Sequence, residues 1–137
     1  MKEETLSEYD FLILFCSKLV SRRINSFNML RLEKKLYEYA LDSSYASLFK
    51  MMSINNENER INLIEPITVF CTVGTLIAIN YPEKIVIPFS KDEATRKLDK
   101  YSDEHKEKID TIIGDIFGKP KKHSNVKYYD FSKYTPN

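Results

Sequence analysis

Histidine and cysteine, the residue types that most often carry out chemistry, are few in this 137-residue chain and lie far apart in the sequence. Cys16 and Cys71 each lie inside an apolar stretch, while His105 and His123 stand alone. A zinc site requires ligands at short, regular spacings, and the sequence has none. A thiol surrounded by Phe, Leu, Ile and Val usually behaves as a small hydrophobic side chain. We therefore expect free, reduced core cysteines, and neither a metal nor a cofactor.

The remaining reactive side chains form no recognisable catalytic pattern. Between residues 92 and 115 carboxylates alternate with Lys and Arg, which is typical of the solvated face of a helix. The glycines Gly74, Gly114 and Gly118 are isolated, so the sequence contains no glycine-rich phosphate loop. A nucleophilic Cys–His pair stays open as an alternative, since a fold can bring distant residues together. The sequence nevertheless favours a protein that is not an enzyme.

Basic side chains are the second group that could contact a ligand. The chain has 21 Lys and Arg against 20 Asp and Glu, which excludes a globally basic nucleic-acid-binding protein but leaves local patches open. Arg22 and Arg23 close the first predicted helix, and Lys34 and Lys35 lie opposite the apolar stripe of the second. These four residues are candidates for contacts with a partner protein or with nucleic acid.

The C-terminal segment, residues 119–137, mixes cations and aromatic rings without any regular period. The candidate contact residues in it are Lys119, Lys121, Lys122, Tyr128, Tyr129 and Phe131. Proteins that bind single-stranded nucleic acid interleave these residue types, and aromatic side chains are also good anchors for a protein partner. The simpler interpretation is a solvated terminus whose aromatic rings pack back on the domain.

The first half of the chain has the pattern of a helical bundle. A Thr-x-x-Glu capping box predicts that the first helix begins near Thr5, and its apolar middle makes it the central helix. Residues 24–27 are predicted to connect it to a second, amphipathic helix over about residues 28–41, capped by Ser26 or Asn28, with Glu33 among the charged residues mostly opposite its apolar stripe. A short third helix follows at residues 45–52. The polar segment from Ser53 to Arg60 is predicted to be an exposed loop.

The stretch from Asn62 to Phe89 is the best-specified part of the sequence. An Asn-x-x-Glu capping box at Asn62 and Glu65 predicts a short, mostly buried helix that ends at Gly74. Two β-branched segments, 75–79 and 85–89, flank turn residues and predict a β-hairpin. Pro88 cannot donate to a sheet, so the second strand should lie at an edge or end there.

Capping signals also mark the last two helices. Ser-x-x-Glu at Ser90 opens one helix, and Ser102 with Asp103 opens another that Gly118 and the following Pro120 end. The sequence thus predicts a single compact domain over residues 1–118 and a basic, aromatic C-terminal tail over 119–137. Its fold class is α+β, mainly helical, with one two-stranded β-hairpin and a winged-helix-like order of elements.

Two segments resemble the Panacea or SocA-like domain of bacterial antitoxins and phage-associated proteins. Residues 32–37, Leu-Glu-Lys-Lys-Leu-Tyr, are similar to that family's Leu-Gln-Lys-Leu-Leu-Tyr helix, which also follows a helix and a short connection. Residues 101–104, Tyr-Ser-Asp-Glu, resemble the start of its late helix. The chain has Asn62–Phe89 in place of the family's Tyr-Gly-Pro-Val stretch. The resemblance implies a small, non-enzymatic protein that neutralises or regulates another protein, encoded by a bacterium, phage or mobile element.

Two functions are compatible with these sequence features. The first is a cytoplasmic interaction protein that binds and inhibits or regulates a partner protein, with its oligomeric state open. The alternative is a winged-helix-like DNA-binding transcriptional regulator, although the helix that would enter the major groove carries Glu65 and no Lys or Arg. The longest apolar run, residues 11–16, is too short to span a bilayer, so no membrane association is expected.

Overall fold

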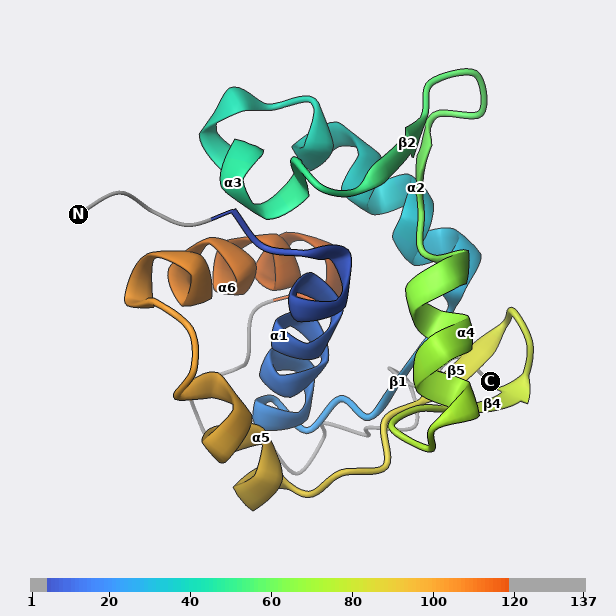
Figure 1. Ribbon diagram of the computed structural model, residues 1–137, viewed down its shortest axis with the longest axis vertical. Coiled ribbons are helices and arrows are strands. Elements are labelled where there is room, and N and C mark those ends of the chain that lie inside the picture. Colours follow the sequence, from blue (N-terminus) through green and yellow to red (C-terminus); the bar gives the residue numbers. More distant parts are fainter. Residues whose placement is uncertain (1–4, 119–137) are drawn as a thin grey trace.

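The computed structural model describes residues 5–118 of the chain (Figure 1). It is an α+β fold dominated by helices, as the sequence predicts. In chain order the elements are α1 (Glu8–Ser21), β1 (Ser26–Phe27), α2 (Met29–Ala40), a 3-10 turn (Ser43–Tyr45), α3 (Ala46–Phe49), β2 (Ser53–Asn55), β3 (Arg60–Asn62), α4 (Ile64–Thr72), β4 (Ile77–Asn80), β5 (Lys84–Val86), α5 (Lys91–Leu98) and α6 (Asp103–Phe117).

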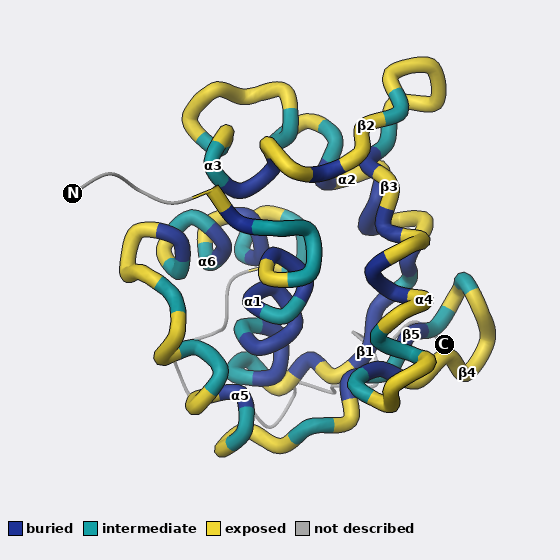
Figure 2. Tube along the Cα trace, in the orientation of Figure 1, coloured by how far each residue is buried: buried dark blue, intermediate teal, exposed yellow. Residues whose placement is uncertain are grey.

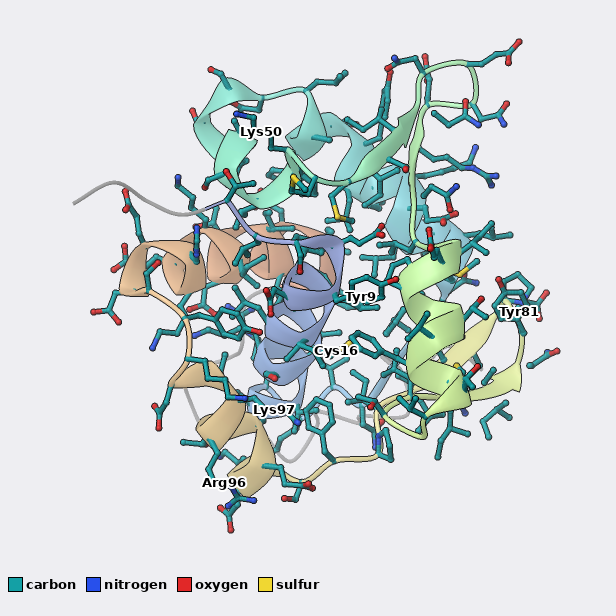
Figure 3. All side chains as sticks on the ribbon, viewed as in Figure 1. Tyr9, Cys16, Lys50, Tyr81, Arg96 and Lys97 are labelled. Atoms are coloured by element: carbon teal, nitrogen blue, oxygen red, sulfur yellow. The ribbon has the colours of Figure 1, made fainter. Side chains whose placement is uncertain are left out.

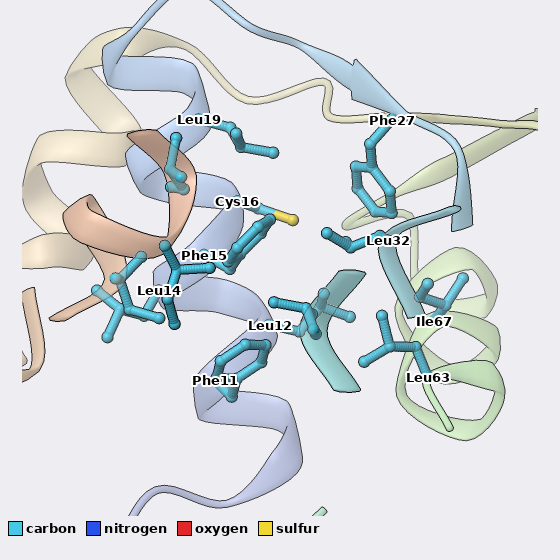
Figure 4. Packing of buried hydrophobic residues seen from close by; sticks show 14 of the residues in the cluster. Phe11, Leu12, Leu14, Phe15, Cys16, Leu19, Phe27, Leu32, Leu63 and Ile67 are labelled. Atoms are coloured by element: carbon cyan, nitrogen blue, oxygen red, sulfur yellow. The ribbon is translucent and has the colours of Figure 1, made fainter. Parts of the chain in front are cut away.

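Helix α1 is the centre of the fold, as its apolar sequence predicts. It packs against α3, α4, α5 and α6, and Phe11, Leu12, Phe15 and Leu19 are fully buried around it (Figure 4). Each such side chain contributes about 1.5–3 kcal/mol by leaving water. The prediction that the helix begins near Thr5 is wrong by a few residues. Ser7 is the cap, because its Oγ accepts the Asp10 N–H at 3.0 Å, so a Ser-x-x-Asp pattern starts the helix.

The predicted hairpin exists, but it belongs to a three-stranded antiparallel sheet in the order β1-β5-β4. Strand β1 pairs Ser26 with Val86 and Phe27 with Ile85. The sequence predicts only a connection at this segment, because two residues are too few to show a strand period. Strand β5 ends at Val86, before Pro88, which was one of the two predicted outcomes.

A second hairpin, β2–β3, lies where an exposed loop was predicted: the segment from Ser53 to Arg60 is largely exposed, as predicted, but it contains two short strands that the prediction missed. Ile54 pairs with Ile61, and Ile61 is fully buried. The Asn-rich sequence between the strands is turn chemistry: Asn55 Oδ1 accepts the Asn58 N–H at 2.9 Å, and Glu59 adopts a positive φ of 54°. The polar turn residues dominate the composition of this segment, and for this reason the two short strands beside them were not predicted from the sequence.

The last two helices begin where the sequence predicts. Both hydrogen bonds of the Ser90–Glu93 capping box are present, and Ser102 Oγ accepts the His105 N–H at 3.1 Å. Helix α6 ends at Gly118, whose φ of 87° suits glycine. The predicted tail, 119–137, lies outside the described residues. Within the described part of the chain, no helix is long and apolar enough to cross a membrane.

Candidate protein-interaction surface

The basic residues that the sequence singled out on α1 have mainly local roles in the described structure. Arg22 is half-buried, and its Nη2 donates to the backbone oxygen of Asp110 at 3.2 Å and lies 3.4 Å from Asp110 Oδ1. Lys18 Nζ donates to the other carboxylate oxygen of Asp110 at 2.8 Å. Arg22 therefore joins α1 to α6. Arg23 is exposed and has a positive φ of 66° where the chain leaves the helix.

The other residues that the sequence singled out belong to α2 or to the C-terminal segment. Lys34 and Lys35 are both exposed on α2, as predicted. Lys119, Lys121, Lys122, Tyr128, Tyr129 and Phe131 lie outside the described residues. The described cations predicted to form a contact patch thus lie on two different helices, and one of them, Arg22, is engaged within the domain.

A different surface stands out, which we call the α4–β4 face. It consists of large apolar side chains that remain exposed along α4, β4 and the turn after it, namely Ile64, Val69, Val73, Ile77, Ile79 and Tyr81. Val73 is 67% exposed and Ile79 is 63% exposed. The two elements contact each other, and Figure 2 shows both as mainly exposed at one side of the molecule. Because these exposed apolar side chains belong to elements that contact each other, the face is a candidate binding surface.

The structure of α4 explains how apolar residues come to lie on both of its sides. Pro66 and Ile67 face the core, and Val69 and Val73 lie one turn apart on the solvent side. Gly74, with a φ of 85°, then turns the chain, and the N–H groups of Thr75 and Leu76 donate to Phe70 O. The prediction that this helix is mostly buried is therefore wrong. A helix with apolar residues on every side predicts either burial or an interface, and here one side is exposed.

Strand β4 adds an exposed sheet edge to the face. Among residues 5–118 it pairs only with β5, and its four residues, Ile77–Asn80, are all exposed and uncharged. Natural sheet edges are commonly protected by lysines, prolines or bulges. Of these devices β4 has one, an irregularity in the register between Ala78 and Asn80, which leaves Ile79 without a direct partner on β5. Both the edge and its apolar side chains are accessible.

Carboxylates flank this apolar surface. Glu65 lies in the first turn of α4, where a negative charge is favourable, and Glu8 of α1 lies near it. Burial, and next the negative charge of Glu65, raise the pKa of Glu8. At the other end, Glu83 accepts a hydrogen bond from Asn80 Nδ2 at 3.0 Å, in the same turn as Tyr81, whose exposed side chain is labelled in Figure 3. No Lys or Arg belongs to α4 or β4, and the cation next to this end of the face is Lys84 of β5, which pairs with Asn80.

A buried carboxylate on α2 fixes the start of α4. Glu33 Oε2 accepts the Leu63 N–H at 2.7 Å, and Arg60 Nη1 lies 3.7 Å from Glu33 Oε1. This arrangement replaces the predicted Asn62–Glu65 capping box, since Asn62 Oδ1 instead accepts the Ile64 N–H at 3.0 Å. Glu33 was expected to face solvent with the other charged residues of α2, and this expectation is also wrong. Burial raises the pKa of Glu33, whereas the Leu63 N–H and Arg60 act to lower it.

The two cysteines are free, as predicted, and neither environment activates the thiol. Cys16 is buried on α1, and burial raises its pKa. Cys71 is half-buried on α4, and burial raises its pKa as well. A protonated thiol is a poor nucleophile. Among residues 5–118, no group of three or more His, Cys, Asp or Glu side chains is placed to hold a metal ion.

A shallow groove of about 310 Å³ continues from the end of α4 towards α5. Val73, Pro88 and Phe89 supply its apolar side, and Lys97 Nζ lies 5.1 Å from the centre of the Phe89 ring. Such cation–π contacts hold a long side chain against an aromatic surface. On α5 the groove is lined by Glu93 and by Lys97, which Figure 3 labels, so its far wall carries one charge of each sign.

Comparison with protein-family models, with curated proteins and with solved structures gives no match. The resemblance to the Panacea or SocA-like domain therefore stays a prediction. The α4–β4 face is the feature of this structure that most needs a functional explanation.

Proposed function

We propose that this chain is a non-enzymatic interaction protein that binds another protein through the α4–β4 face. The observation that carries the proposal is the set of large apolar side chains left exposed along α4 and β4, beside an open sheet edge. A partner that buries these exposed apolar side chains gains a favourable free energy of about 25 cal/mol per Å² of apolar surface removed from water. An open edge can in addition pair with an extended segment of a partner.

The chemistry around the face specifies the partner segment. Apolar side chains should fill the centre, and Lys or Arg should flank them, because Glu8, Glu65 and Glu83 border the surface. In cytoplasm, binding of this kind would inhibit or regulate the partner. This role agrees with the antitoxin-like, phage or mobile-element origin that the sequence resemblance implies, and both remain part of the proposal.

The test compares two apolar residues of equal exposure on different parts of the surface. Ile79→Asp places a charge in the α4–β4 face, and Leu41→Asp, at a residue that is 61% exposed beyond the end of α2, is the matched control. The tagged full-length chain and both variants are used to capture proteins from cells of the source organism. Candidate partners are then purified and titrated calorimetrically.

We expect a partner that the unmodified chain and Leu41→Asp bind alike, with affinity reduced at least about tenfold by Ile79→Asp, which corresponds to 1.4 kcal/mol. A partner that binds all three proteins equally would refute this face as the site. Failure of the unmodified chain to bind any protein directly would count against the proposed function itself.

One observation favours the alternative, a winged-helix-like DNA-binding regulator. The strand order β1-β5-β4, with α4 directly before the β4–β5 hairpin, is the arrangement that a winged helix uses. However, residues 41–63 separate α2 from α4, and α4 exposes Val69 and Val73 where a groove helix needs cations. A gel-shift series at increasing salt decides, because DNA binding through Lys34 and Lys35 would weaken steeply with salt and become less salt-dependent in the Lys34→Gln/Lys35→Gln variant.

A further inference from the structure

We propose that the chain's own C-terminal segment, residues 119–137, covers the α4–β4 face and is displaced when a partner binds. The inference deepens the proposed function and rests on it, because it concerns the regulation of the same surface. It follows from three features: the charge of the segment against that of the face, its aromatic content, and the length of chain that follows α6.

Charge separates the segment from the rest of the protein. Its basic residues are Lys119, Lys121, Lys122, Lys127 and Lys133, and its one acidic residue is Asp130. Subtracting these from the 21 basic and 20 acidic side chains of the whole chain leaves 16 basic and 19 acidic ones for residues 1–118. A cationic segment is thus joined to an anionic domain, in which Glu8, Glu65 and Glu83 border the α4–β4 face.

The segment also has large apolar side chains that could pack against the exposed apolar side chains of the α4–β4 face. Tyr128, Tyr129 and Phe131 lie together, with Tyr134 close behind and Lys127 just before. Aromatic side chains bury large areas and frequently anchor an interface, and β-forming residues suit an open strand such as β4. Cations beside apolar side chains are also what the face requires of a partner segment, so the tail and the partner would compete.

The length of the segment permits this contact. Helix α6 ends at Phe117, and the nineteen residues from 119 onward can extend to about 60 Å at the usual rise of an extended chain. A domain of this size has a radius of gyration of about 13 Å, so every face lies within reach. Reach alone selects no site, and the complementary charge and apolar surface select α4–β4.

A second copy of the chain is the competing occupant of the face. Two copies paired through β4 would bring two anionic domains together, since residues 1–118 carry 16 basic and 19 acidic side chains. Docking of the basic segment instead pairs opposite charges. The experiment must therefore distinguish contact within a chain from contact between chains.

Zero-length carbodiimide crosslinking of the full-length chain provides this distinction, because it joins lysine amines to carboxylates that touch. Ordinary and ¹⁵N-labelled chains are mixed before crosslinking and analysed by mass spectrometry. We expect lysines of residues 119–137 to crosslink to Glu65 or Glu83, in peptide pairs that are entirely light or entirely heavy. Mixed pairs would show a second copy in the site, and crosslinks only to carboxylates elsewhere would show another docking position; either result overturns the proposal.

A full-length variant with Tyr128→Ser, Tyr129→Ser and Phe131→Ser tests the apolar contribution. Hydrogen exchange of the β4 amides should become at least about tenfold faster in this variant, while exchange within α1 stays unchanged and shows that the fold is intact. Equal β4 exchange in both proteins would overturn the proposal. The variant should also capture the partner more strongly than the unmodified chain. Direct partner binding without the intramolecular crosslinks would remove only this inference, whereas crosslinks without any protein partner would remove the proposed function.

Discussion

Removal of the Glu33 carboxylate tests how the α4–β4 face is held in place. Its Oε2 accepts the Leu63 N–H at 2.7 Å, with Arg60 Nη1 3.7 Å from Oε1. Glu33 and Leu63 are both fully buried. Glu33→Ala therefore deprives a buried N–H at the start of α4 of its acceptor and leaves a void between α2 and the β3–α4 connection. Glu33→Gln keeps an oxygen that can accept the Leu63 N–H, removes the charge and replaces the other carboxylate oxygen by an NH2 group.

The two substitutions should differ clearly in stability. An unsatisfied buried donor costs about 1–3 kcal/mol, and the better helix propensity of Ala on α2 returns at most about 0.7 kcal/mol. We expect Glu33→Ala to lower the free energy of unfolding by about 2 kcal/mol. Glu33→Gln should stay within about 1 kcal/mol of the unmodified chain, since removing a buried charge offsets the loss of its attraction to Arg60.

The pH dependence of stability, compared between Glu33→Gln and the unmodified chain, tests the role assigned to the Glu33 carboxyl group. Burial raises the pKa of Glu33 in the folded chain above its ordinary value of 4.5, despite the opposing effects of the Leu63 N–H and Arg60. The folded state therefore holds this proton more tightly, and the stability that Glu33 contributes is complete below pH 4.5 and declines as pH rises through its folded pKa. The Gln side chain of Glu33→Gln does not titrate. The free energy of unfolding of this variant, relative to that of the unmodified chain, should therefore increase as pH rises through the folded pKa of Glu33.

Urea unfolding followed by circular dichroism measures these differences, with Glu38→Ala, at an exposed site on the same helix, as the control. Hydrogen exchange at the Leu63 amide supplies a local measurement. The reasoning is refuted if Glu33→Ala is no less stable than Glu38→Ala, or if the Leu63 amide keeps its protection in Glu33→Ala. A relative stability of Glu33→Gln that falls as pH rises above 4.5 would contradict the assigned direction of the pKa shift.

The exposed face, the turn after α4 and the cap of α5 each give a further prediction. Ile79→Asp and Leu41→Asp should each change the free energy of unfolding, measured with urea, by no more than about 0.5 kcal/mol, because both side chains are largely exposed. A larger loss for Ile79→Asp alone would mean that the stability of β4 depends on the Ile79 side chain. Gly74→Ala should cost about 1 kcal/mol by the same measurement, from its φ of 85° alone, since an added Cβ meets no atom within 4 Å; an unchanged or higher stability would contradict this. The Ser90 backbone N–H holds the pKa of Glu93 below its usual value, so Glu93 stabilises the fold above pH 4.5 and this contribution is lost as pH falls through its folded pKa. In Glu93→Gln the loss of stability at acid pH should therefore be smaller than in the unmodified chain. In Ser90→Gly, an NMR titration should show the pKa of Glu93 returning to its ordinary value only if the cap geometry is lost.

Features that act between near neighbours in the chain could be predicted from the sequence. The Ser90–Glu93 box, the stop at Gly118, the turn at Gly74 and the β4–β5 hairpin all depend on a few adjacent residues, and the structure has them. The apolar middle of α1 likewise predicted its central position.

Features that depend on contacts between distant residues could not be predicted in this way. Glu33 has the helical position of a solvated charge, and only the Leu63 N–H, thirty residues further on, explains its burial. Strand β1 forms because Phe27 meets Ile85 across the fold, and its two residues show no period of their own. The Asn62–Glu65 box failed for the same reason, since Glu33 occupies the position that a local cap would take.

The exposed side of α4 was missed because an apolar residue has the same appearance in sequence whether it faces the core or a partner. Ile67 and Val69 are both β-branched residues of one helix, yet one is fully buried and the other exposed. Their difference lies in what surrounds α4: the buried anchors Leu63 and Leu76 hold its two ends, and Pro82 O accepts the Met29 N–H at 3.0 Å to fix the β4–β5 turn. A face anchored at both ends does not have to be ordered by its ligand, which lowers the entropic cost of binding. It follows that Glu33→Ala, although it changes no exposed residue, should weaken binding at the α4–β4 face by loosening one of these anchors.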